Sequence, residues 1–138
     1  MIQIRSKLSG EVIHMVYTED DFTSQRTELV HPTNFIQCSY LKFNEGFTFR
    51  PHKHIWKEPT FNKMIAQESW VVIRGSVEVS FFDLDGSDLA KVVLKEGDSS
   101  FTLEGGHNYL ILEDDTVVYE YKTGPYTGQE NDKEFLDQ

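Results

Sequence analysis

Cysteine, basic residues and long apolar runs are all scarce in this sequence. Cys38 is the one cysteine among 138 residues, so no internal disulfide can form. The first residues lack the apolar stretch of a signal peptide or membrane span, so we expect a cytoplasmic protein. Lysine and arginine total 13 against 23 aspartates and glutamates, a net charge of −10. Such a surface repels phosphates, which argues against nucleic-acid and membrane binding.

The length and composition fit a single domain. With 38% hydrophobic residues, a chain of this size can bury roughly two thirds of its unfolded surface. No internal repeat or low-complexity tract interrupts it. We expect residues 34–122 to form a barrel. The more polar residues 1–33 are expected to be an N-terminal arm, and residues 123–138 an acidic C-terminal tail.

Apolar residues recur at period two, which predicts strands rather than helices. In residues 68–74, Glu68, Trp70 and Val72 share one face, and residues 76–83 and 116–122 alternate in the same way. Glycine, asparagine and aspartate turns separate these runs about every 8–12 residues. The pattern predicts an all-β, antiparallel sandwich or barrel.

Two of the five histidines, His52 and His54, are two positions apart in a run that we predict to be a strand over residues 47–54. Period two places both rings on one face, where they could bind one metal ion. We expect Glu68, at the start of the next strong strand, to be a third ligand. His107, directly after Gly105-Gly106, is the fourth candidate.

This spacing resembles the first cupin motif, G(X)5HXH(X)3–4E(X)6G. Five residues separate Gly46 from His52, and six separate Glu68 from Gly75. The departure is the gap between His54 and Glu68, which is thirteen residues rather than three or four and requires an inserted loop.

Glu58 is the rival carboxylate, because its distance from His54 is about the usual one. Pro59 follows it at once and no strand begins there, so we favour Glu68. The second cupin motif is matched more loosely by Gly97, Leu103, Gly105 and His107, with Leu103 in place of the proline.

A narrower resemblance, over residues 34–136, is to the WbuC-type cupin-fold metalloproteins found with O-antigen and other surface-polysaccharide biosynthesis genes. The shared features are Gln37, His52, His54, Glu120, Lys122, Gly124-Pro125-Tyr126 and Asp132-Lys133. The resemblance implies a double-stranded β-helix (jelly roll), a bound divalent metal ion, and a link to nucleotide-sugar or glycan metabolism.

The resulting functional hypothesis is a metal-dependent enzyme with isomerase- or epimerase-like chemistry on a small, sugar-derived molecule. A metal-dependent dioxygenase and a non-catalytic sugar- or metal-binding protein are the alternatives. The ion would be Zn, Fe, Mn or Ni. The expected catalytic residues are Glu120, Tyr109 and Lys122, and the expected ligand-binding residues are Gln37, Tyr40, Arg50 and Tyr119.

Three further expectations concern residues outside the predicted site. His14 and His31 are expected at the surface, and Cys38 in the core. The inserted loop, residues 55–67, is too apolar for a freely solvated loop. We expect it to cover the barrel mouth or a partner subunit, in a homodimer.

Overall fold

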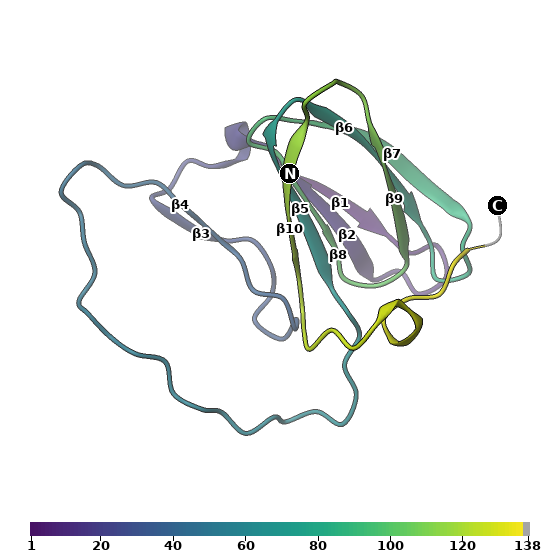
Figure 1. Ribbon diagram of the computed structural model, residues 1–138, viewed down its shortest axis with the longest axis horizontal. Helices are drawn as coiled ribbons and strands as arrows, with labels where there is room; N and C mark the ends of the chain where they lie inside the picture. The colour runs from purple at the N-terminus through teal and green to yellow at the C-terminus, as the bar shows by residue number, and fades with distance from the viewer. Residues whose placement is uncertain (137–138) are drawn as a thin grey trace.

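The computed structural model describes residues 1–136, which form two facing antiparallel sheets and a small outlying hairpin (Figure 1). The five-stranded sheet contains, in order, β1 (Ile2–Arg5), β2 (Val12–Tyr17), β8 (Ser99–Thr102), β5 (Glu68–Arg74) and β10 (Val117–Lys122). The three-stranded sheet contains β7 (Asp88–Lys95), β6 (Ser76–Phe82) and β9 (Gly106–Ile111). The hairpin pairs β3 (Arg26–Glu28) with β4 (Ser39–Leu41), and two short 3-10 turns are η1 (Glu19–Asp21) and η2 (Gln129–Asn131).

The prediction of an all-β, antiparallel fold is confirmed, since every strand pairing among the described residues is antiparallel. The predicted strands over residues 68–74, 76–83 and 116–122 correspond to β5, β6 and β10. Gly75 makes the β5–β6 turn with a φ of 83°, and a side chain there would overlap Thr116. That turn therefore requires glycine.

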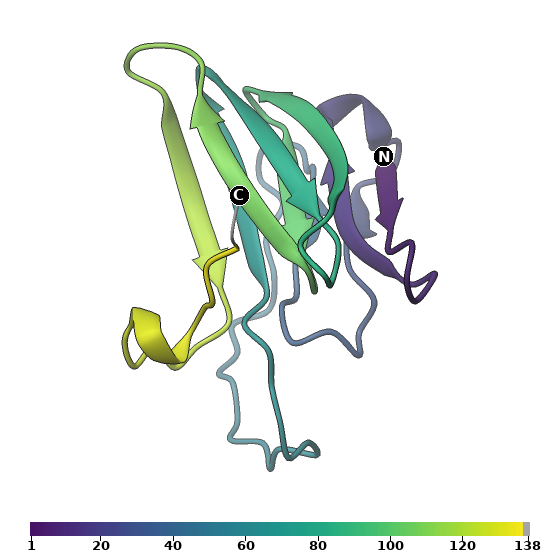
Figure 2. The ribbon, with the colours of Figure 1, turned by 90° about the vertical axis from the view of Figure 1, so that its right-hand side faces the viewer.

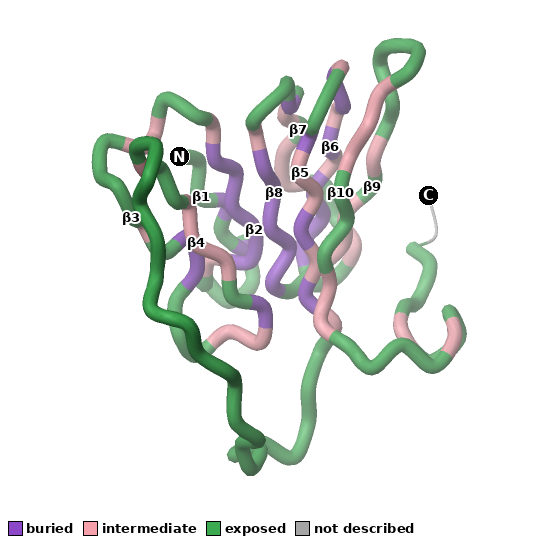
Figure 3. The backbone as a smooth tube through the Cα atoms, turned by 60° about the vertical axis from the view of Figure 1, so that its left-hand side comes forward, coloured by how far each residue is buried: buried purple, intermediate pink, exposed green. Residues whose placement is uncertain are grey.

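Two apolar cores lie on opposite faces of the five-stranded sheet. The inner core, between the two sheets, includes Val16, Val72 and Phe81. The outer core includes Phe101 and Met15, and the hairpin residue Tyr40 packs against it. Because β2 and β8 are covered on both faces, almost all their residues are buried (Figure 3).

The chain ends are more integrated than expected. Residues 1–33 do not simply wrap around a barrel, because β1 and β2 are paired strands of the five-stranded sheet. The expectation that His14 lies at the surface was wrong: it is fully buried in β2, whereas His31 is exposed. In the described part of the expected tail, residues 124–131, which include η2, loop outward and are mostly exposed, and residues 132–136 return past the ends of β9 and β10 (Figure 2).

The prediction of a strand over residues 47–54 was wrong. Residues 42–67 contain no strand or helix, and residues 42–64, which we call the projecting arm, extend away from both sheets (Figure 1). An extended segment needs a neighbouring strand to satisfy its backbone groups, and this one has none. Within the described residues, no helix has the length and apolar character needed to cross a membrane.

Candidate functional site

A cavity of about 750 Å³ is lined by both sheets and by the C-terminal segment. Cross-strand partners share a face of a sheet, so Glu68, paired with Thr102 and with Lys122, forms one row on the inner face of the five-stranded sheet. Trp70, paired with Ser100 and with Glu120, forms the next row. From the opposite sheet, β9 contributes His107 and Tyr109 to the cavity.

Glu68 and His107 form the central polar contact of this cavity. Although they are far apart in sequence, His107 Nε2 lies 3.1 Å from Glu68 Oε1. Trp70 Nε1 donates a hydrogen bond of 3.1 Å to the same oxygen. Both side chains are largely buried, with 22% and 13% of the side-chain surface of His107 and Glu68 exposed. The carboxylate is therefore held in a defined position by two nitrogen atoms.

The electrostatics of the pair favour an ionised carboxylate. Burial acts to raise the pKa of Glu68, but the contacts with His107, together with Lys133 and the Trp70 hydrogen bond, outweigh burial and lower this pKa overall. His107 Nδ1 is buried and makes no hydrogen bond within residues 1–136. A buried nitrogen without a partner is costly.

An aromatic stack forms the wall beside this pair. The rings of Trp70 and Tyr109 lie parallel, with centroids 3.8 Å apart and an interplanar angle of 6°. The Tyr109 hydroxyl is 3.2 Å from Ser100 Oγ. Burial strongly raises the pKa of Tyr109, so its hydroxyl stays protonated at neutral pH and acts as a hydrogen-bonding group.

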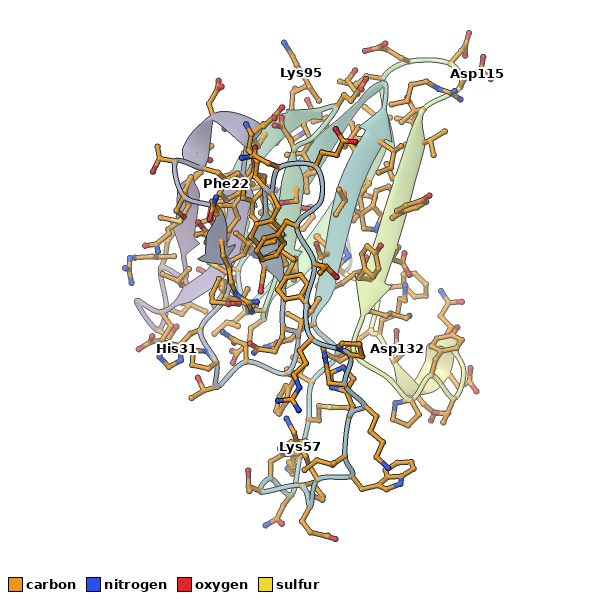
Figure 4. The ribbon with its side chains drawn as sticks, turned by 90° about the vertical axis from the view of Figure 1, so that its left-hand side faces the viewer. Phe22, His31, Lys57, Lys95, Asp115 and Asp132 are labelled. Atoms are coloured by element: carbon orange, nitrogen blue, oxygen red, sulfur yellow. The ribbon has the colours of Figure 1, made fainter. Side chains whose placement is uncertain are left out.

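The C-terminal segment closes one side of the cavity. Lys122 Nζ forms an ion pair of 2.9 Å with Asp132 and lies 4.2 Å from the centre of the Tyr126 ring. Leu136 packs on Gly106 so closely that an added Cβ there would be 2.6 Å from Leu136 Cδ1. Asp132 appears at the base of the sheets in Figure 4. These contacts hold residues 132–136 against the cavity.

Of the four predicted metal ligands, the structure brings together Glu68 and His107. His52 and His54 are exposed on the projecting arm, with ring centroids 5.5 Å apart, and His52 Nδ1 lies 3.0 Å from the carbonyl oxygen of Arg50. The rival acid, Glu58, is also exposed on the arm. Within the described residues, no group of three or more potential ligands is arranged around a metal position.

The other predicted site residues divide into two groups. Glu120 and Tyr109 line the cavity. Lys122 does not line it but forms an ion pair with Asp132, which does. The predicted ligand-binding residues lie elsewhere: Gln37, Tyr40, Arg50 and Tyr119 are not among the residues that line the cavity. Tyr119 alternates with Glu120 on β10 and so lies on the opposite face. Tyr40 stacks on Phe22 in the outer core, and Gln37 Nε2 donates to the Asn34 carbonyl at 2.7 Å.

Several cavity residues were not predicted from the sequence. Trp70, Thr102 and the C-terminal residues Asp132 and Lys133 line it alongside Glu68. The period-two pattern places Trp70 on the face of Glu68, a signal that could have identified it. A second cavity, of about 800 Å³, lies beside Met15, His31 and Gln67 and contains none of the predicted site residues.

Comparison of the chain with protein-family models, curated proteins and solved structures gives no match. The evidence for function therefore comes from the site itself.

The Glu68–His107 contact has the length of a hydrogen bond, and the same separation is compatible with two ligands of one metal ion. Two donor atoms that bind one ion at about 2.1 Å each lie about 3.0–3.4 Å apart. The observed separation of 3.1 Å is in this range. An imidazole nitrogen and a carboxylate oxygen are also ligands that zinc, iron, manganese and nickel accept.

Proposed function

We propose that this protein is a metal-binding cupin, with its two sheets forming a jelly roll, that acts on a small, sugar-derived molecule in the cavity between them. The observation that carries the proposal is the Glu68–His107 pair, with its 3.1 Å separation inside a cavity of about 750 Å³. A cavity of this volume suits a ligand of monosaccharide or nucleotide-sugar size. The resemblance to cupins adds His52 and His54 as the remaining ligands.

In this proposal Glu68 and His107 hold a divalent ion, which when bound would polarise a carbonyl or hydroxyl oxygen of the ligand. Glu120 is the best placed general base, because it lines the cavity beside Trp70 and makes no ion pair within the described residues. The stacked rings of Trp70 and Tyr109 exclude water from one side of the cavity. The ion pair between Lys122 and Asp132 holds residues 132–136, the C-terminal wall of the cavity, in place.

The proton-transfer assignment favours isomerase- or epimerase-like chemistry, in which a carboxylate removes and returns a proton next to a polarised carbonyl. Glu120 suits this step better than Tyr109, since burial raises the pKa of the Tyr109 hydroxyl. A role in polysaccharide or nucleotide-sugar metabolism is what the family resemblance implies.

Metal content and proton exchange test the two parts of this proposal separately. Elemental analysis of purified wild-type protein should give about one divalent ion per chain, and His107→Ala should lower this content severalfold. His31→Ala is the matched control, because His31 is exposed and remote from the cavity. Equal metal content in the two variants would contradict the assignment. Glu120→Gln should retain the metal and abolish exchange of ligand protons with deuterated solvent.

A further inference from the structure

The cavity between the two sheets is strongly acidic. Acids outnumber lysines and arginines by 23 to 13 in the whole chain, but by six to one in the cavity lining, where Lys133 is the one base. With His107 neutral, the lining therefore has a formal charge of −5. The acids are Glu68, Asp83, Glu104, Glu120, Asp132 and Glu134. Because a concave site focuses the field of its charges, the charge of a ligand strongly affects its binding here.

Three of the six carboxylates already have partners within the protein. Asp132 forms an ion pair of 2.9 Å with Lys122, and Glu68 contacts His107 at 3.1 Å. Asp83 is 1% exposed and accepts hydrogen bonds of 2.6 and 2.8 Å from two backbone amides. These groups are held by the fold and contribute least to the selection of a ligand by its charge.

The other three carboxylates are available to a ligand. Glu104, Glu120 and Glu134 are exposed at the cavity and make no ion pair among the described residues. The charge of Lys133 contributes to the lowered pKa of Glu68. The lining thus has three carboxylates without an ion pair and a single lysine, so the excess negative charge lies on groups that a ligand can reach.

Two of these carboxylates lie at the same end of the cavity. Leu136 packs on Gly106, where an added Cβ would be 2.6 Å from Leu136 Cδ1. Glu104 and Glu134 are each two residues from this contact, so the Cα atom of each lies within about 7 Å of the Cα atom of Gly106 or Leu136. Carboxylates only accept hydrogen bonds, and an ammonium group supplies three donors and the opposite charge. This end of the cavity is therefore complementary to an amine.

The proposed metal ion does not reverse the charge of the cavity. A divalent ion adds +2 and the neighbouring Lys122 adds +1, which leaves −2 from the lining charge of −5. A protonated His107 would still leave −1. A phosphate monoester carries about −1.5 to −2 at neutral pH, so the cavity repels phosphorylated ligands with or without the ion.

We propose that the cavity binds an unphosphorylated amino sugar, with its ammonium group at Glu104 and Glu134, and excludes sugar phosphates and nucleotide sugars. The inference rests on the proposed function, which takes the ligand to be a sugar. It narrows that function to one class of ligand, because a nucleotide sugar would bring its phosphates into an acidic cavity. Glu120, beside Trp70, remains the general base.

Calorimetric titration with matched sugars tests this selection by charge. The ligands are glucosamine, glucose, glucosamine 6-phosphate and UDP-glucose, with the corresponding galactose series, all at pH 7 and low salt. An amino sugar should bind at least about tenfold more tightly than its neutral or phosphorylated counterpart. Raising the salt concentration should reduce this preference. Equal binding of the amino and neutral sugars, or no binding in either series, would overturn the inference.

The same titrations separate this inference from the proposed function. Tightest binding of UDP-glucose would overturn the inference and leave a metal-dependent action on sugars standing. Absence of bound metal and of proton exchange, with the amino-sugar preference retained, would do the reverse.

A pair of variants tests the position of the amine site. Glu104→Gln/Glu134→Gln should lose the preference for the amino sugar by about tenfold. Glu45→Gln/Glu58→Gln, at exposed acids of the projecting arm, changes the net charge equally and should keep it. Equal losses in the two variants would assign the preference to the charge of the whole protein and overturn the site.

Discussion

The buried histidine of β2 predicts a steep loss of stability in mild acid. His14 is fully buried, with Nε2 3.0 Å from the Phe82 carbonyl oxygen and Nδ1 3.2 Å from Thr102 Oγ1. A carbonyl can only accept a hydrogen bond, so Nε2 carries the proton and Nδ1 accepts one from the Thr102 hydroxyl. Burial lowers the pKa of His14 from 6.5 to about 4. The folded protein therefore holds this ring neutral.

The size and sign of the effect follow from the two pKa values. Between about pH 6.5 and pH 4 the unfolded chain binds a proton at His14 and the folded protein does not, so the free energy of unfolding falls as the pH falls. At about 1.4 kcal/mol for each pH unit, the loss reaches about 2–3 kcal/mol by pH 4.5. This is a large part of the roughly 5–15 kcal/mol that stabilises a typical domain.

Urea unfolding at pH 7.5 and pH 4.5, followed by circular dichroism, measures this loss. His14→Phe should be less stable at pH 7.5 by about 1–3 kcal/mol, because the Phe82 carbonyl and the Thr102 hydroxyl lose their partner. Its decrease in stability between the two pH values should nevertheless be smaller than that of the wild type by about 2–3 kcal/mol. His31→Phe, at an exposed position, should behave as the wild type. An equal decrease in His14→Phe and wild type would refute the reasoning.

Two further predictions concern the C-terminal segment and the buried side chain of Gln67. Gly106→Ala should displace Leu136, since the new methyl group would lie 2.6 Å from Leu136 Cδ1. Trypsin should then cleave after Lys133 severalfold faster than in the wild type. An unchanged cleavage rate would contradict the packing of Leu136 on Gly106. Gln67→Ala should lower the free energy of unfolding by about 2 kcal/mol or more, because it leaves the buried Ile36 amide, 3.0 Å from Gln67 Oε1, without an acceptor. Gln37→Ala, at an exposed residue, should lower the free energy of unfolding by less than about 1 kcal/mol, as measured by urea unfolding. Similar losses in the two variants would argue against the hydrogen bond between Gln67 and Ile36.

The strands that alternate clearly could be predicted from the sequence because one face of each is buried. In β5, Glu68 and Trp70 share the inner face, as the alternation predicts, and Gly75 makes the turn with a positive φ. The position of His14 could not be predicted by alternation, because β2 is buried on both faces. A signal was nevertheless present: the run VIHMVY is almost continuously apolar, which is typical of a strand covered on both sides.

The candidate site could be predicted in part, for a similar physical reason. Glu68 lies on β5 and His107 on β9, and each strand is paired within its own sheet, so both positions follow from the sheets. His52 and His54 depend on a segment that has no strand partner in the described chain, and local alternation cannot supply one. The C-terminal wall was missed because its polar composition suggests a frayed tail, whereas the Lys122–Asp132 ion pair and Leu136 hold it in place.

The two candidate carboxylates give the most direct test of the proposed metal site. Calorimetric titration of metal-free wild type, Glu68→Gln and Glu58→Gln with Zn²⁺ and Mn²⁺ compares them under the same conditions. Glutamine at position 68 can still accept the hydrogen bond from Trp70 but loses the negative charge. Glu68→Gln should therefore weaken binding by about tenfold or more, while Glu58→Gln, on the exposed arm, should remain within about twofold of the wild type. A larger loss for Glu58→Gln, or no loss for Glu68→Gln, would contradict the account.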